Sequence, residues 1–187
     1  MPLAKTTLLV IDVQRGILET PHTAREKEVA QALDKTVVRI AGLIARARTA
    51  LVPVIYVQHD GSPGDRLEPE TTGWPIRSEI APQPGERVIH KRACDAFFET
   101  TLDADLTAAG ITRLVVCGCM TQYCIDTTVR RAVALGYDVV LAADGHATAD
   151  TETLRFEQII AHHNATLDGF DAGKHKVCVS PSSDIRI

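Results

Sequence analysis

The chain has 187 residues, of which 45% are hydrophobic and 24% charged, and its net charge is −4. This composition is typical of one globular domain and excludes a disordered chain, a fibre and a strongly basic nucleic-acid-binding protein. The longest apolar runs are far shorter than the roughly 20 residues of a membrane span, and the N-terminus lacks the pattern of a secretion signal. We therefore expect a single cytoplasmic domain over residues 1–187, without nucleic-acid or membrane partners.

Strand-like and helix-like segments alternate along the chain. Short apolar runs predict strands at 6–13, 52–57, 87–90, 114–117, 139–142 and 176–179. Apolar residues at three- and four-residue steps predict a helix at 24–50. Gly110 and Gly136 close predicted helices at 101–109 and 123–135, and a further helix is expected at 151–164. Continuous apolar strands are typical of burial on both faces, and helices between them indicate βαβ units. We predict an α/β, three-layer α-β-α Rossmann-like fold with a central, mostly parallel six-stranded sheet.

One connection is much longer than the others. Residues 58–86 are rich in glycine, proline and charge, and they contain the chain's single tryptophan, Trp74. Loops of this length are uncommon inside compact domains and often cover active sites. Three interpretations stay open: a surface excursion in which Trp74 covers an edge of the core, a lid over an active site, or a subunit contact.

Polar residues follow the predicted strands at the positions where open parallel sheets bind their ligands. Asp12 follows the first strand, His59 the second and Lys91 the third. Asp12 is either a strand-terminal cap or a site residue, and a lysine at a strand end most often reaches solvent. A lysine that instead points toward an acid and a thiol would lower the pKa of that thiol.

The five cysteines are Cys94, Cys117, Cys119, Cys124 and Cys178. An odd count without an export signal indicates reduced thiols rather than a disulfide framework. The C-x-C-x4-C spacing in residues 117–124 lacks the paired C-x2-C unit of a zinc site, so we expect no metal there. Cys117 and Cys178 are predicted to be buried packing residues within strands, and Cys94 receives no role.

The segment around Cys124 carries the most chemical information. A predicted strand runs into a tight turn at Gly118 and then into a helix whose first residues include Cys124. A helix N-terminus carries partial positive charge and free N–H groups, which stabilise a thiolate and an oxyanion. Asp12, Lys91 and Cys124 therefore form a candidate set of acid, cation and nucleophile. Two histidines at strand ends, His59 and His146, remain alternative bases.

These residues resemble the isochorismatase-like cysteine hydrolases, a superfamily that includes nicotinamidases, N-carbamoylsarcosine amidohydrolase and streptothricin hydrolase. The resemblance rests on the strand and Asp-Val-Gln of residues 8–14, on the segment that follows Lys91, and on residues 118–124 with the threonines after them. It covers residues 6–179 and implies an isochorismatase-like fold.

The resemblance also implies roles for individual residues. Asp12 corresponds to the base that accepts the thiol proton, Lys91 to the cation that steadies it, and Cys124 to the nucleophile. A cis peptide is implied between Cys119 and Met120. The N–H groups of Met120 and Cys124 would form the oxyanion hole.

Two positions depart from the family pattern. Metal-dependent nicotinamidases carry Asp-x-His after the second strand, whereas this chain has His59 followed by Asp60 and no histidine before His90. We therefore expect no metal and no other cofactor. The usual serine before Ala-Phe is replaced by Asp95, which would either alter the pocket or face outward.

The expected activity is metal-independent hydrolysis of a C–N bond in a small amide, lactam or ureido compound, through a covalent Cys124 acyl-enzyme. Two alternatives stay open, namely an isochorismatase-type vinyl-ether hydrolase that uses Asp12, and a catalytically silent family member. Family members assemble as homodimers or homotetramers, and we expect the same of this chain. Candidate pocket residues, each of which could equally be packing, are Gln14, His59, Trp74, Phe97 and Tyr123.

Overall fold

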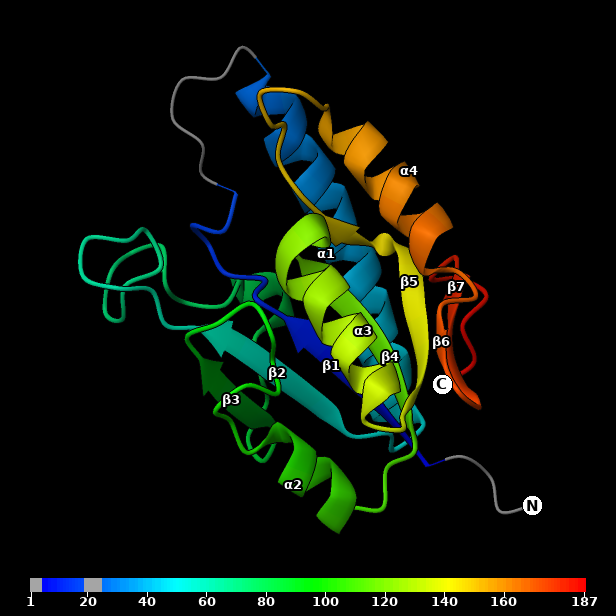
Figure 1. Cartoon of the computed structure of the whole chain (residues 1–187). Helices are drawn as coiled ribbons and strands as arrows, with labels where there is room; N and C mark the ends of the chain where they lie inside the picture. The colour runs from blue at the N-terminus through cyan, green and yellow to red at the C-terminus, as the bar shows by residue number, and fades with distance from the viewer. Residues whose placement is uncertain (1–4, 19–24) are drawn as a thin grey trace.

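The computed structural model describes residues 5–18 and 25–187, which form a seven-stranded sheet with helices on both faces (Figure 1). The strands are β1 (Thr6–Ile11), β2 (Val54–His59), β3 (Arg87–Lys91), β4 (Arg113–Cys119), β5 (Asp138–Ala147), β6 (Asp171–Ala172) and β7 (His175–Ser180). The helices are α1 (Glu26–Thr49), α2 (Leu102–Ala108), α3 (Asp126–Ala134) and α4 (Phe156–Leu167), with a 3₁₀ turn η1 (Ser78–Ile80) and a π-helical turn η2 (Thr121–Ile125).

The predicted α/β architecture with a mostly parallel central sheet is confirmed. The strand order is β3-β2-β1-β4-β5-β7-β6, and every pairing is parallel except that of β6 with β7. The two-residue strand β6 is the seventh strand, which the sequence did not predict because so short a segment has no periodicity. The predicted helix start at residue 24 lies outside the described residues.

Two predicted helices begin elsewhere. The helix predicted from 151 begins at Phe156, because Asp150 accepts the Phe156 N–H at 2.8 Å and Thr151 N donates to Leu154 O at 2.9 Å, which folds the preceding residues into a turn. The helix predicted from 123 begins as the π-helical turn at Thr121 and becomes α-helical at Asp126.

The sheet is buried on both faces, as its continuous apolar strands require. Leu8 and Val10 of β1 pack with α1, while Leu9 and Ile11 pack with α2 and α3 on the other face. Helix α4 lies along β5 and β7 and also contacts η2 (Figure 1). Among the described residues, none of the helices has the length and apolar character needed to cross a membrane.

Gly118 lets the end of β4 approach β1 closely. Its φ is +132°, and a Cβ atom at this position would lie 2.0 Å from the carbonyl oxygen of Ile11. Any other residue would therefore force the two strands apart. The close pairing of Ile11 with Gly118 brings the turn after β4 beside Asp12, the residue that follows β1.

Candidate active site

The carboxyl ends of β1 and β3, two parallel strands on either side of β2, bring the predicted acid and lysine together. Asp12 follows β1 and is fully buried, with φ +51° and its N–H donated to Val57 O at 2.9 Å. Lys91 ends β3 and is 2% exposed. Its Nζ lies 2.6 Å from Asp12 Oδ2, and both side chains are completely shielded from solvent.

The ammonium group of Lys91 also reaches the predicted nucleophile. Lys91 Nζ lies 3.3 Å from Cys124 Sγ and donates to Ala93 O at 2.9 Å. His59 Nδ1 is 3.3 Å from the same nitrogen. The structure therefore brings Asp12, Lys91 and Cys124 into one buried cluster, with His59 at its edge.

Asp12 is poised to exchange a proton. Burial raises its pKa above the ordinary value, and the Lys91 charge and the Cys124 thiol oppose that rise. Within the described residues, neither carboxylate oxygen receives a hydrogen bond of good geometry besides the Lys91 ion pair. A buried carboxylate that is not saturated with donors can accept a further proton.

Cys124 lies in η2 rather than in the first turn of an α-helix. The N–H groups of Tyr123 and Ile125 both donate to Met120 O, at 3.1 and 3.2 Å, which winds the turn around Cys124. The peptide bond between Cys119 and Met120 is cis, as the resemblance implies.

The sequence predicts a stabilised thiolate at Cys124, whereas the pKa of this thiol lies above its ordinary value. Burial and the neighbouring Asp12 carboxylate raise the pKa of this thiol, and Lys91 only partly opposes them. The resting group is therefore a thiol. To act as a nucleophile, such a thiol must transfer its proton to a partner.

A pocket of about 220 Å³ opens onto this cluster. Asp12 and Cys124 form its floor, and residues 65–67 of the long loop form part of its wall. The loop therefore contributes directly to the pocket, which fits the lid interpretation better than a remote surface excursion. The remaining lining residues are Ile17, His59, Cys94, Met120 and Tyr123. A larger hollow of about 460 Å³ lies elsewhere, between α1 and α4.

Two of the five predicted pocket residues line this pocket. His59 is half-buried there, and burial together with Lys91 lowers its pKa. Tyr123 lies at the mouth with 50% of its surface exposed.

The structure places the other three predicted pocket residues outside it. Gln14 is fully buried, and its amide donates to His59 O and Trp74 O and accepts from His59 N, so no polar group is free for a ligand. Trp74 donates from Nε1 to Asp60 at 2.9 Å and stacks on His90. These contacts make Gln14 and Trp74 supports of the long loop.

Phe97 belongs to the apolar core. It is 8% exposed and stacks on Tyr137 at a centroid distance of 6.0 Å. The neighbouring Asp95 accepts the Phe97 N–H at 2.8 Å and lies 3.8 Å from the half-exposed Arg131, so this departure from the family pattern faces outward.

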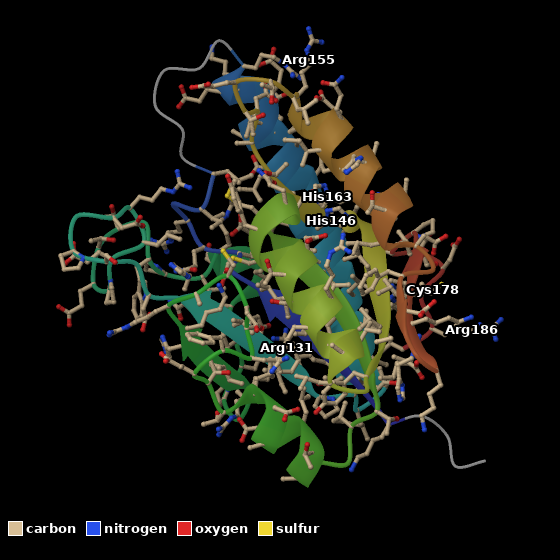
Figure 2. The ribbon with its side chains drawn as sticks, in the orientation of Figure 1. Arg131, His146, Arg155, His163, Cys178 and Arg186 are labelled. Carbon is tan, nitrogen blue, oxygen red and sulfur yellow. The ribbon has the colours of Figure 1, made fainter. Side chains whose placement is uncertain are left out.

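The other cysteines differ from expectation in two places. Cys117 is buried as predicted, but Cys178 on β7 is exposed, because only alternate residues of this strand face the core (Figure 2). Cys94, to which the sequence assigned no role, lines the pocket with Cys124. Cys94 lies in a loop, where no hydrophobic periodicity indicates which way a side chain faces, so the sequence did not predict its position in the pocket.

The groups that could hold a metal ion are dispersed. Over residues 5–18 and 25–187, no three His, Cys, Asp or Glu side chains are arranged to ligate a cation. Asp60, which follows His59 in the sequence, accepts from Trp74 Nε1 and lies 3.0 Å from His90 Nδ1.

Comparison with known proteins gives a consistent result. Residues 6–165 match the isochorismatase domain. The chain is 43% identical over 143 residues to a streptothricin hydrolase of Streptomyces noursei, a match that covers 76% of this chain and 50% of that protein. It is 33% identical over 138 residues to the ureidoacrylate amidohydrolase RutB of Variovorax paradoxus strain S110, covering 58% of this chain and 55% of RutB. The chain thus spans about half the length of these curated relatives.

A solved structure extends the match to nearly the whole chain. The crystal structure of an isochorismatase from Pseudomonas putida KT2440 superposes with a TM-score of 0.84 and 31% sequence identity, covering 97% of this chain and 90% of that one. With the domain match over residues 6–165, this similarity identifies the chain as a member of the isochorismatase family of hydrolases.

Proposed function

We propose that this chain is a cysteine hydrolase that cleaves a C–N bond of a small amide, lactam or ureido compound through a covalent acyl-enzyme on Cys124. The observation that carries the proposal is the buried cluster in which Lys91 Nζ contacts both Asp12 and Cys124, at 2.6 and 3.3 Å. The names of two relatives, a streptothricin hydrolase and a ureidoacrylate amidohydrolase, support hydrolysis of compounds that contain nitrogen.

In the first half-reaction, Cys124 Sγ attacks the carbonyl carbon and its proton passes to Asp12. The developing negative charge on the carbonyl oxygen is held by backbone N–H groups, for which Met120 and Cys124 are the candidates. When the tetrahedral intermediate collapses, the C–N bond breaks, Asp12 returns the proton to the departing nitrogen, and a thioester remains on Cys124.

In the second half-reaction, water enters the pocket and attacks the thioester carbonyl. Asp12 accepts one proton from the water, the C–S bond breaks, and the proton returns to the sulfur. The product is a carboxylic or carbamic acid, and the enzyme is restored. Lys91 remains protonated throughout and stabilises whichever neighbour carries negative charge, the Asp12 carboxylate or the Cys124 thiolate.

The raised pKa values of Cys124 and Asp12 support these roles of nucleophile and proton carrier. A thiol with a raised pKa becomes a nucleophile only when a nearby base accepts its proton. A carboxylate whose pKa is raised by burial is a stronger base than one in water, and a larger fraction of it holds a proton near neutral pH, ready for the leaving nitrogen.

The test is a panel of small primary amides, lactams and ureido compounds, assayed for released ammonia or amine. We expect turnover of at least one compound by the wild type and by Cys178→Ser, because Cys178 is exposed on β7. We expect none from Cys124→Ser.

Each alternative gives a different result. Activity that survives in Cys124→Ser but is lost in Asp12→Asn would indicate chemistry of the vinyl-ether hydrolase type and contradict the proposal. A wild type that releases nothing from the panel and never becomes acylated on Cys124 would indicate a catalytically silent family member.

A further inference from the structure

A buried histidine lies behind the turn that carries Cys124. His146, near the end of β5, is 1% exposed, and both of its ring nitrogens have partners. Nδ1 is 2.9 Å from Thr121 Oγ1, and Nε2 is 2.8 Å from Asn164 Oδ1 on α4. Figure 2 labels His146 together with His163, the other histidine used below, which belongs to α4.

Asn164 fixes the direction of these hydrogen bonds. Asn164 Nδ2 donates to the carbonyl of Ala143 at 2.9 Å, so Asn164 Oδ1 faces the imidazole as an acceptor. Nε2 of His146 must therefore carry the hydrogen, and Nδ1 must accept the hydroxyl hydrogen of Thr121. This chain of three hydrogen bonds is compatible with a single neutral tautomer of His146.

This series of hydrogen bonds ends at Thr121, the first residue of η2. Thr121 is fully buried; Met120, which precedes it, and Cys124, which follows three residues later, both line the pocket. A second bond runs parallel to the first, since Thr148 donates to Gln122 at 2.6 Å. Two consecutive side chains of the turn are thus attached to the end of β5.

From these contacts we propose that His146 is a positioning residue. Held by Asn164, it fixes Thr121 and thereby aligns η2, with Cys124 and its neighbouring backbone N–H groups, against Asp12 for acyl transfer. This inference rests on the proposed function.

His146 acts at a distance from the reacting atoms. It does not line the pocket that contains Asp12 and Cys124, and both ring nitrogens are engaged. It is therefore not the alternative base that the sequence left open. Burial also lowers its pKa to about 4, so at neutral pH Nδ1 is free of a proton and can accept from Thr121.

The test compares Thr121→Val with Thr121→Ser. Valine keeps the shape of threonine but has no hydroxyl, whereas serine keeps the hydroxyl that His146 accepts. The probe substrate is p-nitrophenyl acetate, whose turnover requires both attack by Cys124 and stabilisation of an oxyanion. The second readout is the rate at which iodoacetamide alkylates Cys124, a displacement that forms no oxyanion.

We expect Thr121→Val to lower kcat at least about tenfold with little change in KM, because small misplacements of catalytic groups act on the transition state. Alkylation of Cys124 should stay within about twofold of the wild type, since the thiol keeps its charged neighbours. Thr121→Ser should restore most of the lost kcat.

His146→Gln should behave as Thr121→Val does, and the double variant should lose no more than either single one, because both changes break one connection. His163→Gln is the matched control. This histidine lies on the same helix as Asn164, and its Nδ1 is 2.8 Å from Ile159 O in the backbone of that helix. The His163→Gln variant should keep the wild-type kcat.

Several results would overturn the inference. Thr121→Val could keep the wild-type kcat, Thr121→Ser could lose as much as Thr121→Val, or kcat and alkylation could fall in parallel as in general misfolding. A failure of the proposed function is distinguishable, because it would appear in the wild type as absence of both ester turnover and acylation of Cys124.

Discussion

Two buried thiols seven positions apart, the packing residue Cys117 and the proposed nucleophile Cys124, lie in different surroundings. Cys117 lies inside β4, where its Sγ is 3.7 Å from the carbonyl of Leu9 and its neighbours are apolar. Cys124 lies in η2 beside Asp12 and Lys91. Burial raises the pKa of both thiols.

Thiol acidity therefore does not separate the two regions. What separates them is a base that can take the proton, a cation beside that base and a pocket that admits a substrate, all of which are found at Cys124. Under the proposed function, the reactivity of Cys124 would arise from the convergence of the ends of β1, β3 and β4 and not from the helix start alone.

The largest expected effect sharpens this contrast. Cys124→Ala should lower turnover by at least about a thousandfold, because the group that forms the covalent intermediate is removed. Cys117→Ala should leave turnover unchanged and lower the free energy of unfolding by about 1 kcal/mol, the cost of a small cavity in β4. Steady-state assays and urea denaturation of the two variants measure both effects. The reverse pattern would place the nucleophile in β4.

The next prediction concerns charge around Cys124. In Asp12→Asn, the carboxylate that raises the thiol pKa is gone and Lys91 remains, so the pKa of Cys124 should fall and iodoacetamide should label it faster at pH 7. Turnover should nevertheless fall about 10²–10⁴-fold, because the proton carrier is lost. In Lys91→Met the thiol pKa should rise and labelling should slow.

Peptide mass spectrometry measures this labelling, with the exposed Cys178 as an internal reference. Slower labelling in Asp12→Asn would mean that Asp12 deprotonates the thiol before substrate binds, contrary to the account above. Each variant leaves one buried charge unpaired, so both should also lose about 3–5 kcal/mol of stability.

His146 should make stability depend on pH. Its pKa is about 4 in the folded chain and 6.5 in the reference state. As pH falls from 6.5 to 4, the unfolded chain binds a proton that the folded chain excludes, so the free energy of unfolding should fall by on the order of 3 kcal/mol. His146→Gln should flatten this slope in urea titrations across that range. An unchanged slope would assign the effect to other groups, such as His59, whose pKa is also lowered.

The smallest effects are expected at Tyr123, at the mouth of the pocket, and at Phe97, in the core. Tyr123→Ala should raise KM by about threefold to tenfold with kcat retained, because Tyr123 lies at the mouth and its loss removes binding contacts only. Phe97→Leu should leave KM unchanged and lower stability by about 1 kcal/mol, through loss of its stacking on Tyr137. Steady-state kinetics and thermal denaturation distinguish the two variants. A raised KM in Phe97→Leu would indicate that Phe97 contributes to the pocket after all.

The sequence was sufficient for the parallel strands and for the convergence of Asp12 and Lys91. Continuous apolar runs predicted the parallel strands, and polar residues after them marked Asp12 and Lys91 at one edge. These predictions succeed because strand ends of a parallel sheet converge whatever the loops do.

The pocket wall was less predictable, since it depends on side-chain contacts between segments far apart in the sequence. Gln14 lies shortly after the end of β1 and Trp74 lies within the long loop, yet the polar groups of both are used to attach that loop. His146 was recognised as a strand-end residue, but only the structure brings it to Thr121 and Asn164. No local pattern encodes either outcome.

The most direct test of the central claim is rapid acid quenching of the wild type during turnover of an activated ester, followed by peptide mass spectrometry. The account predicts a transient mass increase equal to the acyl group, confined to the peptide that contains Cys124 and absent from Cys124→Ala. Turnover without any adduct, or an adduct on Cys94 instead, would contradict it.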